Sequence, residues 1–200
     1  MDSLQFINHA SVSIKSNKIN LLTDPWYFGS VFHDGWNLIY ENSEDEIIKT
    51  LNNITHIWIS HEHPDHFSVP FFIKFKDFLK EKSIKILFQK TKDKRVIKFL
   101  NNLGLNTTEL EIGKEYLLDK NFKIKCIKFG FYDSAILINL NGKKIFNLND
   151  CDISNLKDII DLKGKHGTCD VLLTQFSYAA WKGDKNNQKW EKKAAEEKIN

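Results

Sequence analysis

The sequence contains few cysteines, and their placement bears on the redox compartment. The three that occur, Cys126, Cys151 and Cys169, lie far apart and form no C-x-x-C pair. An odd and sparse count excludes a disulfide framework, the usual support of small secreted proteins. We therefore expect a protein of a reducing compartment and predict a cytoplasmic location.

Arginine is scarcer still. Arg95 is the only arginine among 29 basic residues, and the formal net charge is only +3. Sites that bind nucleic acid favour arginine, because its planar fork holds a phosphate through two hydrogen bonds. A nucleic-acid partner is therefore not expected, and a small-molecule substrate is favoured instead.

Long apolar runs are also missing. No apolar run approaches the roughly 18 residues that suggest a membrane-spanning helix. Met1 is followed directly by Asp2 and a short apolar stretch, without the basic and hydrophobic regions of a signal peptide. We expect neither a membrane span nor a leader.

Proline and glycine are too few to form a linker. Only three prolines and nine glycines occur in 200 residues, and no repeat period is visible. Hydrophobic residues make up 42% of the chain and charged residues 28%, which is an ordinary globular balance. A chain of this size buries roughly 70% of its unfolded surface, so its core can support the fold. We predict a single domain over residues 1–200.

Strand-like and helix-like patterns alternate in the first half of the chain, and strands dominate the second half. Short apolar or alternating runs predict strands at 4–7, 11–14, 19–22, 55–60, 84–88, 116–118, 122–129, 135–140, 144–148 and 170–174. Helical spacing predicts helices at 44–53, 69–82, 93–103 and 153–162, and a polar helix at 188–200. Both halves mix the two types, so the predicted class is α/β, as an α+β fold or a layered α/β sandwich.

Local signals mark the ends of several elements. Ser43 and Glu46 have the spacing of a capping box at a helix start. The pair Asn141-Gly142 is a two-residue hairpin turn, which joins its flanking strands in antiparallel fashion. The strands at 55–60 and 170–174 are apolar enough to predict burial.

Four candidate metal ligands lie within residues 61–66, HEHPDH: His61, His63, Asp65 and His66. The run follows the predicted buried strand directly, and a tight loop there allows the side chains to converge. Imidazole binds zinc, iron and similar ions, and a carboxylate adds charge. The proline of the run disfavours helical backbone before it and stiffens the loop. A polar loop with exposed histidines is the alternative, but three of the seven histidines cluster here, which favours a metal site.

The pattern H-x-H-x-D-H resembles the second motif of the metallo-β-lactamase superfamily. Residues 8–10 (NHA) and 23–25 (TDP) are similar to segments of that superfamily's first strands, with asparagine where glycine is usual. The resemblance implies a four-layer αβ/βα sandwich with a metal site at the edges of its sheets. It also implies that Asp24 supports the metal-binding loop, whereas outside this motif an aspartate before proline could simply cap a turn.

Within that superfamily, a closer resemblance is to the CMP-N-acetylneuraminate hydroxylase family. Residues 29–36, GSVFHDGW, resemble its G-x-x-F-x-x-G-W segment, and residues 59–68 resemble its I-S-H-x-H-x-D-H-x-S segment. Asp150-Cys151 resembles its D-C motif. The resemblance runs, with gaps, over about residues 4–190.

Two histidines of the superfamily pattern are absent from their usual places. The third-motif histidine precedes a strand like that predicted at 135–140, but residues 129–134 (FGFYDS) contain no histidine. Asp133 in this stretch matches an aspartate of the hydroxylase branch. The fifth-motif histidine follows a strand like that at 170–174, where this chain continues QFSYAAW. The chain is therefore truncated or its site is incomplete, and the helix pattern that runs to the last residue favours truncation.

The resemblance assigns roles to the ligands. His61 and His63 would bind one metal ion, and Asp65 and His66 would bind a second, unless Asp65 acts as a catalytic base. Asp150 would bridge the two ions or complete the site. One or two divalent ions are expected, zinc first, with iron and manganese as alternatives. A bound metal lowers the pKa of water towards 7 and polarises the substrate.

Aromatic side chains in loops are candidates for substrate contacts. Trp26, Trp36 and Tyr132 are predicted to line a pocket that stacks a base or a sugar, although loop aromatics equally often plug a core. His9 and His56 lie beside predicted strands and are interpreted as structural histidines.

Three functions follow as hypotheses. The first is a metal-dependent hydrolase that acts on a phosphorylated or nucleotide-linked sugar-like substrate, a substrate class implied by the resemblance alone. The second is a monooxygenase component like the hydroxylase family, which needs a Rieske centre held by cysteine and histidine pairs. This sequence has no such pairs, so a separate electron-transfer partner would be required. The third is a degenerate scaffold that binds a nucleotide sugar without turnover.

Overall fold

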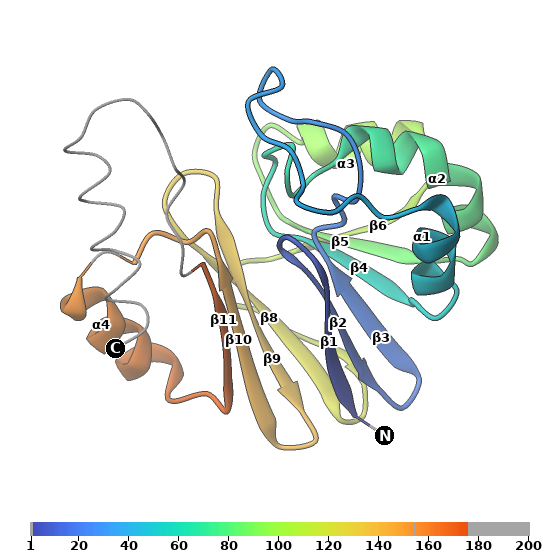
Figure 1. Cartoon of the computed structure of the whole chain (residues 1–200). Helices are drawn as coiled ribbons and strands as arrows, with labels where there is room; N and C mark the ends of the chain where they lie inside the picture. The colour runs from blue at the N-terminus through green and yellow to red at the C-terminus, as the bar shows by residue number, and fades with distance from the viewer. Residues whose placement is uncertain (1, 154, 176–200) are drawn as a thin grey trace.

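The computed structural model describes residues 2–153 and 155–175, and it contains two β-sheets that face each other (Figure 1). The six-stranded sheet has the order β1-β2-β3-β4-β5-β6. Its strands are β1 (Ser3–Asn8), β2 (Ser11–Ser16), β3 (Ile19–Thr23), β4 (His56–Ile59), β5 (Lys85–Gln89) and β6 (Asn106–Leu110). The first three strands pair in antiparallel fashion, and β3 to β6 are parallel.

The five-stranded sheet has the order β11-β10-β9-β8-β7. Its strands are β7 (Glu115–Asp119), β8 (Phe122–Lys128), β9 (Ser134–Leu140), β10 (Lys143–Asn149) and β11 (Val171–Thr174). Strands β7 to β10 form an antiparallel meander, and β11 pairs with β10 in parallel. The predicted hairpin turn joins β9 to β10, and its residues Asn141 and Gly142 have φ angles of +49° and +81°, as a tight primed turn requires.

Helices cover the outer faces of both sheets. Helices α1 (Glu44–Leu51), α2 (Val69–Glu81) and α3 (Arg95–Asn102) lie against the six-stranded sheet, and α4 (Leu156–His166) lies beside the five-stranded sheet (Figure 1). Three clusters of buried apolar side chains fill the interfaces between the layers. The arrangement is the four-layer αβ/βα sandwich that the resemblance implies, so this prediction is confirmed.

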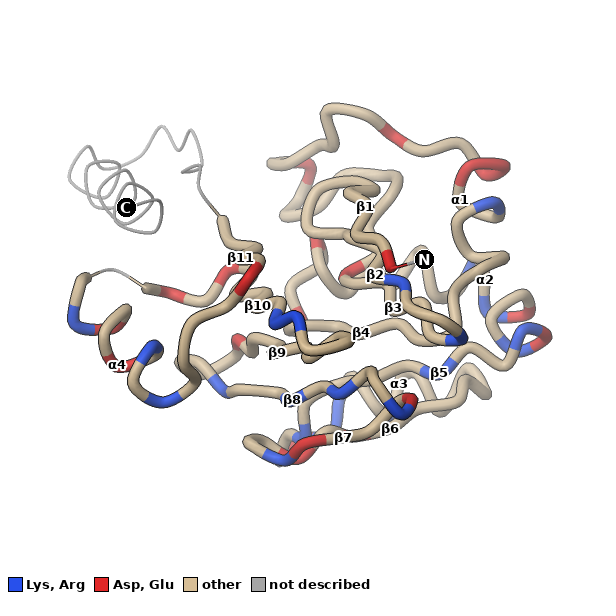
Figure 2. The backbone as a smooth tube through the Cα atoms, turned by 90° about the horizontal axis from the view of Figure 1, so that it is seen from below, with Lys and Arg blue, Asp and Glu red and all other residues tan. Residues whose placement is uncertain are grey.

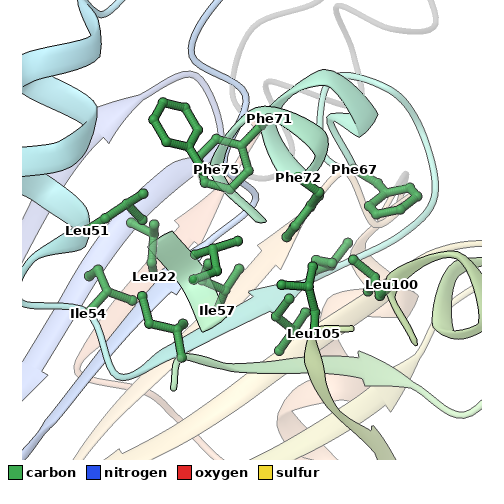
Figure 3. Close-up of a cluster of buried hydrophobic side chains, with 14 of the residues drawn as sticks. Leu22, Leu51, Ile54, Ile57, Phe67, Phe71, Phe72, Phe75, Leu100 and Leu105 are labelled. Carbon is green, nitrogen blue, oxygen red and sulfur yellow. The ribbon is translucent and has the colours of Figure 1, made fainter. Parts of the chain in front are cut away.

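The outer cluster fixes α2 on the six-stranded sheet (Figure 3). Phe71, Phe75 and Leu79 are spaced by four residues, so they share one face of the helix, and each is 4% exposed or less. They pack in one cluster with Leu22 of β3 and Ile57 of β4, both fully buried. Burial of each such side chain contributes roughly 1.5–3 kcal/mol to stability. This packing also holds the loop that precedes α2.

The central strands of the six-stranded sheet are buried on both faces. Leu22 and Ile57 enter the cluster below the helices, whereas their neighbours Leu21 and Trp58 enter the cluster between the two sheets. A strand covered on both sides needs apolar residues at successive positions. The apolar run of β4 therefore predicts its burial correctly.

Two edge strands differ from the sequence predictions. Strand β6 is not predicted, because its residues, NTTEL, are mostly polar. Within the described part of the chain it forms the edge of its sheet and pairs with β5 alone. The strand predicted as buried at 170–174 is β11, in which Val171 and Leu172 are 37% and 46% exposed. It also lies at a sheet edge, so its apolar residues do not become core and the prediction of burial is wrong.

Helix ends follow local hydrogen bonding. The capping box is confirmed, since the Ser43 side chain accepts from the backbone N–H of Glu46 and the Glu46 carboxylate accepts from that of Ser43 at 2.8 Å. The helix predicted at 153–162 begins later, at Leu156, because the side chain of Asn155 caps it there. The polar helix predicted at 188–200 lies outside the described residues.

Basic residues occur on both the helices and the strands. Lysine and arginine positions are spread over α1, α2, α4 and β8 (Figure 2). Among the described residues, no helix is both long enough and apolar enough to cross a membrane.

Candidate metal centre

The loop at 61–66 lies where strands of both sheets end. It connects β4 to α2, so it starts at the carboxyl end of a parallel strand. Asp24 follows β3 at the same edge, while Asp133 precedes β9 and Asp150 follows β10 in the other sheet. Ligand sites in parallel sheets form at the carboxyl ends of strands. The topology therefore gathers these segments at one end of the sandwich.

Asp24 is fully buried and organises the start of the loop. Its carboxylate accepts hydrogen bonds from the backbone N–H of Ser60 at 2.7 Å and from the Ser60 hydroxyl at 2.8 Å. It also lies 3.2 Å from Nδ1 of His66 and accepts a hydrogen bond from the side-chain amide of Asn149. A carboxylate accepts about four hydrogen bonds. The carboxylate is thus saturated by the protein, which makes Asp24 a support of the loop and not a ligand.

The carbonyl of Ser60 links the loop to further strands. It accepts from the side-chain amide of Gln89, at the end of β5, at 3.2 Å and from the hydroxyl of Ser134, at the start of β9, at 2.5 Å. The Gln89 amide also donates to the carbonyl of Tyr132 at 2.5 Å. Asn149 donates to the Ser60 hydroxyl at 2.8 Å. These bonds hold the loops of both sheets in a fixed relation before any ion binds.

His61, His63 and Asp133 form one half of the site. Nε2 of His61 lies 2.9 Å from Nδ1 of His63 and 3.8 Å from Oδ1 of Asp133. The other ring nitrogen of His61 contacts the Ser60 hydroxyl at 2.9 Å, which leaves Nε2 directed at the site. Asp133 brings a carboxylate to this side of the site, in the stretch where the superfamily pattern has its third histidine.

Asp65, His66 and Asp150 form the other half. Nε2 of His66 lies 3.2 Å from Oδ2 of Asp65 and 3.2 Å from Oδ2 of Asp150. His66 is fully buried and Asp65 is 2% exposed. Ligand atoms of His61, His66 and Asp150 all lie within 4.8 Å of one another. The two halves therefore form a continuous cluster around Asp150 and His66.

The polar atoms of the cluster are better placed to bind a metal ion than to form hydrogen bonds with one another. Nε2 of His66 and Oδ1 of Asp65 are buried without a hydrogen-bond partner, although buried polar atoms normally have one. Charge-assisted hydrogen bonds are about 2.7–2.9 Å long, shorter than the 3.2 Å contacts of His66. Ligands bound to tetrahedral zinc at about 2.0–2.1 Å stand about 3.3 Å from one another. A set of imidazoles and carboxylates suits zinc, iron or manganese.

Burial and charge shift the pKa values of the cluster in opposite directions. Burial lowers the pKa of His61 to about 4, so this imidazole is neutral and its nitrogen can bind a metal. Burial also disfavours the charged form of His66, but its contacts with Asp150, Asp24 and Asp65 outweigh burial and raise its pKa well above the usual range. The surplus of carboxylates thus calls for a cation at the centre of the cluster, which a proton or a metal ion can supply.

The three aromatic residues predicted to contact substrate differ in how exposed they are. Trp26 is 2% exposed, and its indole N–H donates to two nearby carbonyl groups at 3.1 Å. It therefore packs in the core, and the substrate contact predicted for it is wrong. Trp36 is 39% and Tyr132 46% exposed. The Tyr132 ring lies 6.0 Å from the ring of His63, at the mouth of the site.

His9, which the sequence analysis interprets as a structural histidine, lies against the site. It occupies the turn between β1 and β2, and its Nε2 lies 3.3 Å from Oδ2 of Asp65. His9, Asp65 and His66 form a second group whose ligand atoms lie within 4.8 Å of one another. His56 lies in β4, where Nδ1 contacts the hydroxyl of Thr55 at 2.9 Å.

Several polar residues that hold the site were not predicted. Ser60 and Asn149 stand directly before the recognised residues His61 and Asp150, so their positions in the motifs carried a usable signal. Gln89 and Ser134 carried none, because each is a single polar residue at the end of a strand. Only the pairing of the sheets brings them to the loop.

A cavity of about 500 Å³ opens beside Asp65 and Asp150. His9 and Asn149 also line its polar side, and Trp36 contributes an aromatic wall together with apolar residues of β1, β2 and β11. Small-molecule sites have volumes of about 300–1,000 Å³ and combine apolar walls with a few polar groups. The cavity can therefore admit a small organic molecule to the cluster.

Comparison with known families agrees with this geometry. A family model described as a beta-lactamase superfamily domain matches residues 3–173, which include every candidate ligand. This chain is a member of the metallo-β-lactamase superfamily. Members of this superfamily bind divalent metals, and the His and Asp groups described above could hold them.

The chain is also similar in sequence to cytidine monophosphate-N-acetylneuraminic acid hydroxylases. It is 30% identical to the Xenopus laevis protein over 156 residues, which cover 75% of this chain and 26% of that protein. It is 24% identical to the Danio rerio protein over 200 residues, which cover 94% of this chain and 32% of that protein. The chain thus spans about a quarter to a third of the length of these relatives.

Solved structures share the fold at low sequence identity. A possible metal-dependent hydrolase from Veillonella parvula is 14% identical with a TM-score of 0.66, and the match covers 92% of this chain and 75% of that one. CmlA, a diiron beta-hydroxylase from Streptomyces venezuelae, is 15% identical with a TM-score of 0.61, over 86% and 34% of the two chains. These similarities show that the fold is shared.

Proposed function

We propose that this chain binds one or two divalent metal ions between its sheets and uses them in hydrolytic catalysis. The observation that carries this proposal is the convergence of His61, His66 and Asp150, whose ligand atoms lie within 4.8 Å of one another although they come from two sheets. Buried partners hold the loop in this arrangement, which a merely polar loop would not require. A degenerate scaffold gives no physical reason for such a cluster.

His61, His63 and Asp133 would hold the first ion. Burial keeps His61 neutral, and Asp133 supplies negative charge in place of a third imidazole. Carboxylate and imidazole together suit zinc, iron and manganese, so the ion is set by geometry and supply. Asp65 and His66 would hold a second ion, and Asp150 would bridge the two ions or complete the site.

When bound, such an ion lowers the pKa of water towards 7 and polarises a phosphoryl or carbonyl oxygen. Asp65 has a separate capacity to handle a proton. As the alternative to holding the second ion, it would act as a base through Oδ1, which is buried without a hydrogen-bond partner, while its Oδ2 faces His66 and His9. Contacts with His66 and His9 lower the pKa of Asp65 despite its burial, so the carboxylate is ionised.

We propose a phosphorylated or nucleotide-linked sugar-like molecule as substrate. The similarity to hydroxylases named for a cytidine monophosphate sugar supports this class. The cavity beside Asp65 has a suitable volume of about 500 Å³ and an aromatic wall at Trp36. Tyr132, beside His63, is a second contact for a base or a sugar.

A monooxygenase component is the second candidate function. Two observations favour it: the similar curated proteins are hydroxylases, and Asp133 places a carboxylate where the superfamily pattern has a histidine. Iron would then be the metal. Residues 1–200 contain no cysteine and histidine pairs for an iron–sulfur cluster, so the electrons would have to come from outside these residues.

Metal analysis separates these functions. Protein purified without added metal should contain one or two equivalents, and the His63→Ala variant should contain less, while the distant His56→Gln variant should match the wild type. Zinc together with hydrolysis of bis(4-nitrophenyl) phosphate or a lactone would support the hydrolase. Iron together with oxygen consumption in the presence of a reductant would support the monooxygenase component. A wild-type protein that takes up no metal on reconstitution would contradict both.

A further inference from the structure

We propose that His9 is a metal ligand and completes the ion position that Asp65 and His66 begin. The inference rests on the proposed metal-dependent function and adds a ligand from the turn between β1 and β2. It assigns His9 a role in binding the ion, beyond the packing role that its place beside a strand suggests.

The distances around Asp65 are those of ligands that share an ion. Oδ2 of Asp65 lies 3.3 Å from Nε2 of His9 and 3.2 Å from Nε2 of His66. Ligands of a tetrahedral zinc ion stand about 3.3 Å apart, whereas a charge-assisted hydrogen bond draws its partners to about 2.7–2.9 Å. The three atoms therefore match the edges of a coordination polyhedron better than a hydrogen-bonded group.

The number of ligands also points to His9. Catalytic metal positions commonly have three protein ligands and one open place. Asp65 and His66 supply two at this position, and Asp150 lies between both positions. Of the histidines outside the loop, only His9 belongs to a possible metal-binding group among the described residues, whereas His33, His56 and His166 do not.

The fold orients the His9 side chain towards the site. Its ring contacts Trp26 edge-on, with centroids 5.1 Å apart, and its centroid lies 5.7 Å from that of His66. The backbone at His9 has a φ of +40°, next to an irregularity in the pairing of β1 with β2. The preceding Asn8 fixes the turn by donating to the carbonyl of Tyr40 at 2.8 Å.

The same turn places His9 at the entrance of the site. Its side chain is 33% exposed, whereas that of Asp65 is 3% exposed. Both residues line the cavity of about 500 Å³. An ion held by His9 would therefore face the cavity, and its open coordination place would be accessible to a small molecule.

A titration with Co²⁺ and Zn²⁺ tests the inference without any assay of activity. The test variant is His9→Asn, because asparagine tolerates a positive φ but is too short to reach the ion. The matched control is His33→Asn, since His33 also has a positive φ, +54°, and lies exposed in a loop. Stoichiometry, affinity and the Co²⁺ absorption spectrum are measured for the three proteins.

We expect His9→Asn to bind the second equivalent about 100-fold or more weakly, since even outer partners of ligands contribute 10–100-fold to affinity. The first equivalent should bind as in the wild type, which also shows that the variant is folded. The Co²⁺ spectrum of the second equivalent should change, because the ion loses a nitrogen ligand. His33→Asn should match the wild type in every measurement.

Two results would overturn the inference, and they differ from each other. If His9→Asn binds both equivalents with unchanged affinity and spectrum, His9 only hydrogen-bonds to Asp65, and the proposed metal-dependent function stands. If the wild type binds no metal, the proposed function fails and the inference fails with it.

Discussion

Asp24 connects three parts of the chain that are far apart in sequence. It is fully buried and receives hydrogen bonds from Ser60 and Asn149, and it contacts His66. Ser60, Asn149 and His66 are all buried, and they also contact one another. The charge of one carboxylate thus determines the positions of the metal-binding loop and of the end of β10.

We predict that Asp24→Asn lowers the free energy of unfolding of the metal-free protein by about 2–4 kcal/mol, because a buried charge is removed from its donors. Asparagine is compatible with the positive φ of +37° at this position, so backbone strain does not contribute. Urea unfolding measures the change. The control is Asp34→Asn, at an exposed position with a φ of +62°, which should change stability by less than about 0.5 kcal/mol. Equal effects of the two substitutions would contradict the role of Asp24.

His56 makes stability depend on pH independently of the metal site. Burial, together with the nearby Lys85, lowers the pKa of His56 to about 4. The unfolded chain therefore takes up a proton at this residue before the folded chain does. The stabilising contribution is complete above pH 6.5 and is lost as the pH falls from about 6.5 to about 4.

We predict that His56→Gln reduces the loss of stability between pH 7 and pH 4.5 by about 1–2 kcal/mol, a figure reduced for the partial exposure of the side chain. Urea unfolding of both proteins at the two pH values, with a chelator present, measures the difference. All other histidines are common to the two proteins, so their contributions cancel. Parallel stability profiles would show that His56 is not protonated on unfolding.

The predictability of single residues depended on whether they belong to a motif. His61, His63, Asp65 and His66 are adjacent in sequence, so their convergence could be inferred from one loop. His9 could not be placed, because its contact with Asp65 depends on how the turn between β1 and β2 meets a loop 56 residues away.

At the scale of elements, the start of α1 illustrates how a short pattern determines a boundary. Ser43 and Glu46 exchange hydrogen bonds at the helix start. The acidic residues of the first turn interact favourably with the positive end of the helix dipole. The apolar face of the helix then buries Ile47 and Leu51. The capping residues set where the helix begins, and the apolar face sets which side faces the sheet.

We predict that Ser43→Ala destabilises the protein by about 1 kcal/mol, the usual cost of losing a side-chain cap. Ser43→Asp should retain most of the stability, because aspartate also caps a helix start. Thermal unfolding monitored by circular dichroism compares the two variants with the wild type. Equal losses in both variants would mean that the hydroxyl at position 43 acts in some way other than capping.

Predictions of elements failed at the sheet edges for a common physical reason. Central strands such as β4 are covered on both faces, so their composition identifies them. Strand β6 is held in the sheet by its pairing with β5, and its polar residues do not identify it as a strand. In β11 the apolar residues remain partly exposed because the strand lies at the edge of its sheet.

At the scale of the whole molecule, loops from the two sheets meet at the candidate metal centre. The six-stranded sheet supplies the loop at 61–66, and the five-stranded sheet supplies Asp133 and Asp150. An ion bound to ligands from both sheets would tie them together. The order of layers was predictable from the superfamily resemblance, but the hydrogen bonds that align the sheets were not.

We predict that a divalent ion at 100 times its dissociation constant stabilises the folded chain by about 2.7 kcal/mol. For a chain of this size the corresponding rise in Tm is about 5–11 °C. Differential scanning calorimetry with Zn²⁺, Fe²⁺ or Mn²⁺ added to chelator-treated protein measures it. Asp150→Asn should reduce the rise, whereas Asp119→Asn, on the far strand β7, should not. An unchanged Tm with every ion would count against the metal site.

The hydrogen bond between Asn149 and Asp24 joins residues 125 positions apart. During synthesis, the histidines of the loop emerge well before the carboxylates of the second sheet. An early ion would meet an incomplete set of ligands and could exchange freely. If the proposed metal binding is correct, the full set of ligands would exist only after β10 docks, and the metal supply at that stage would decide which ion is bound.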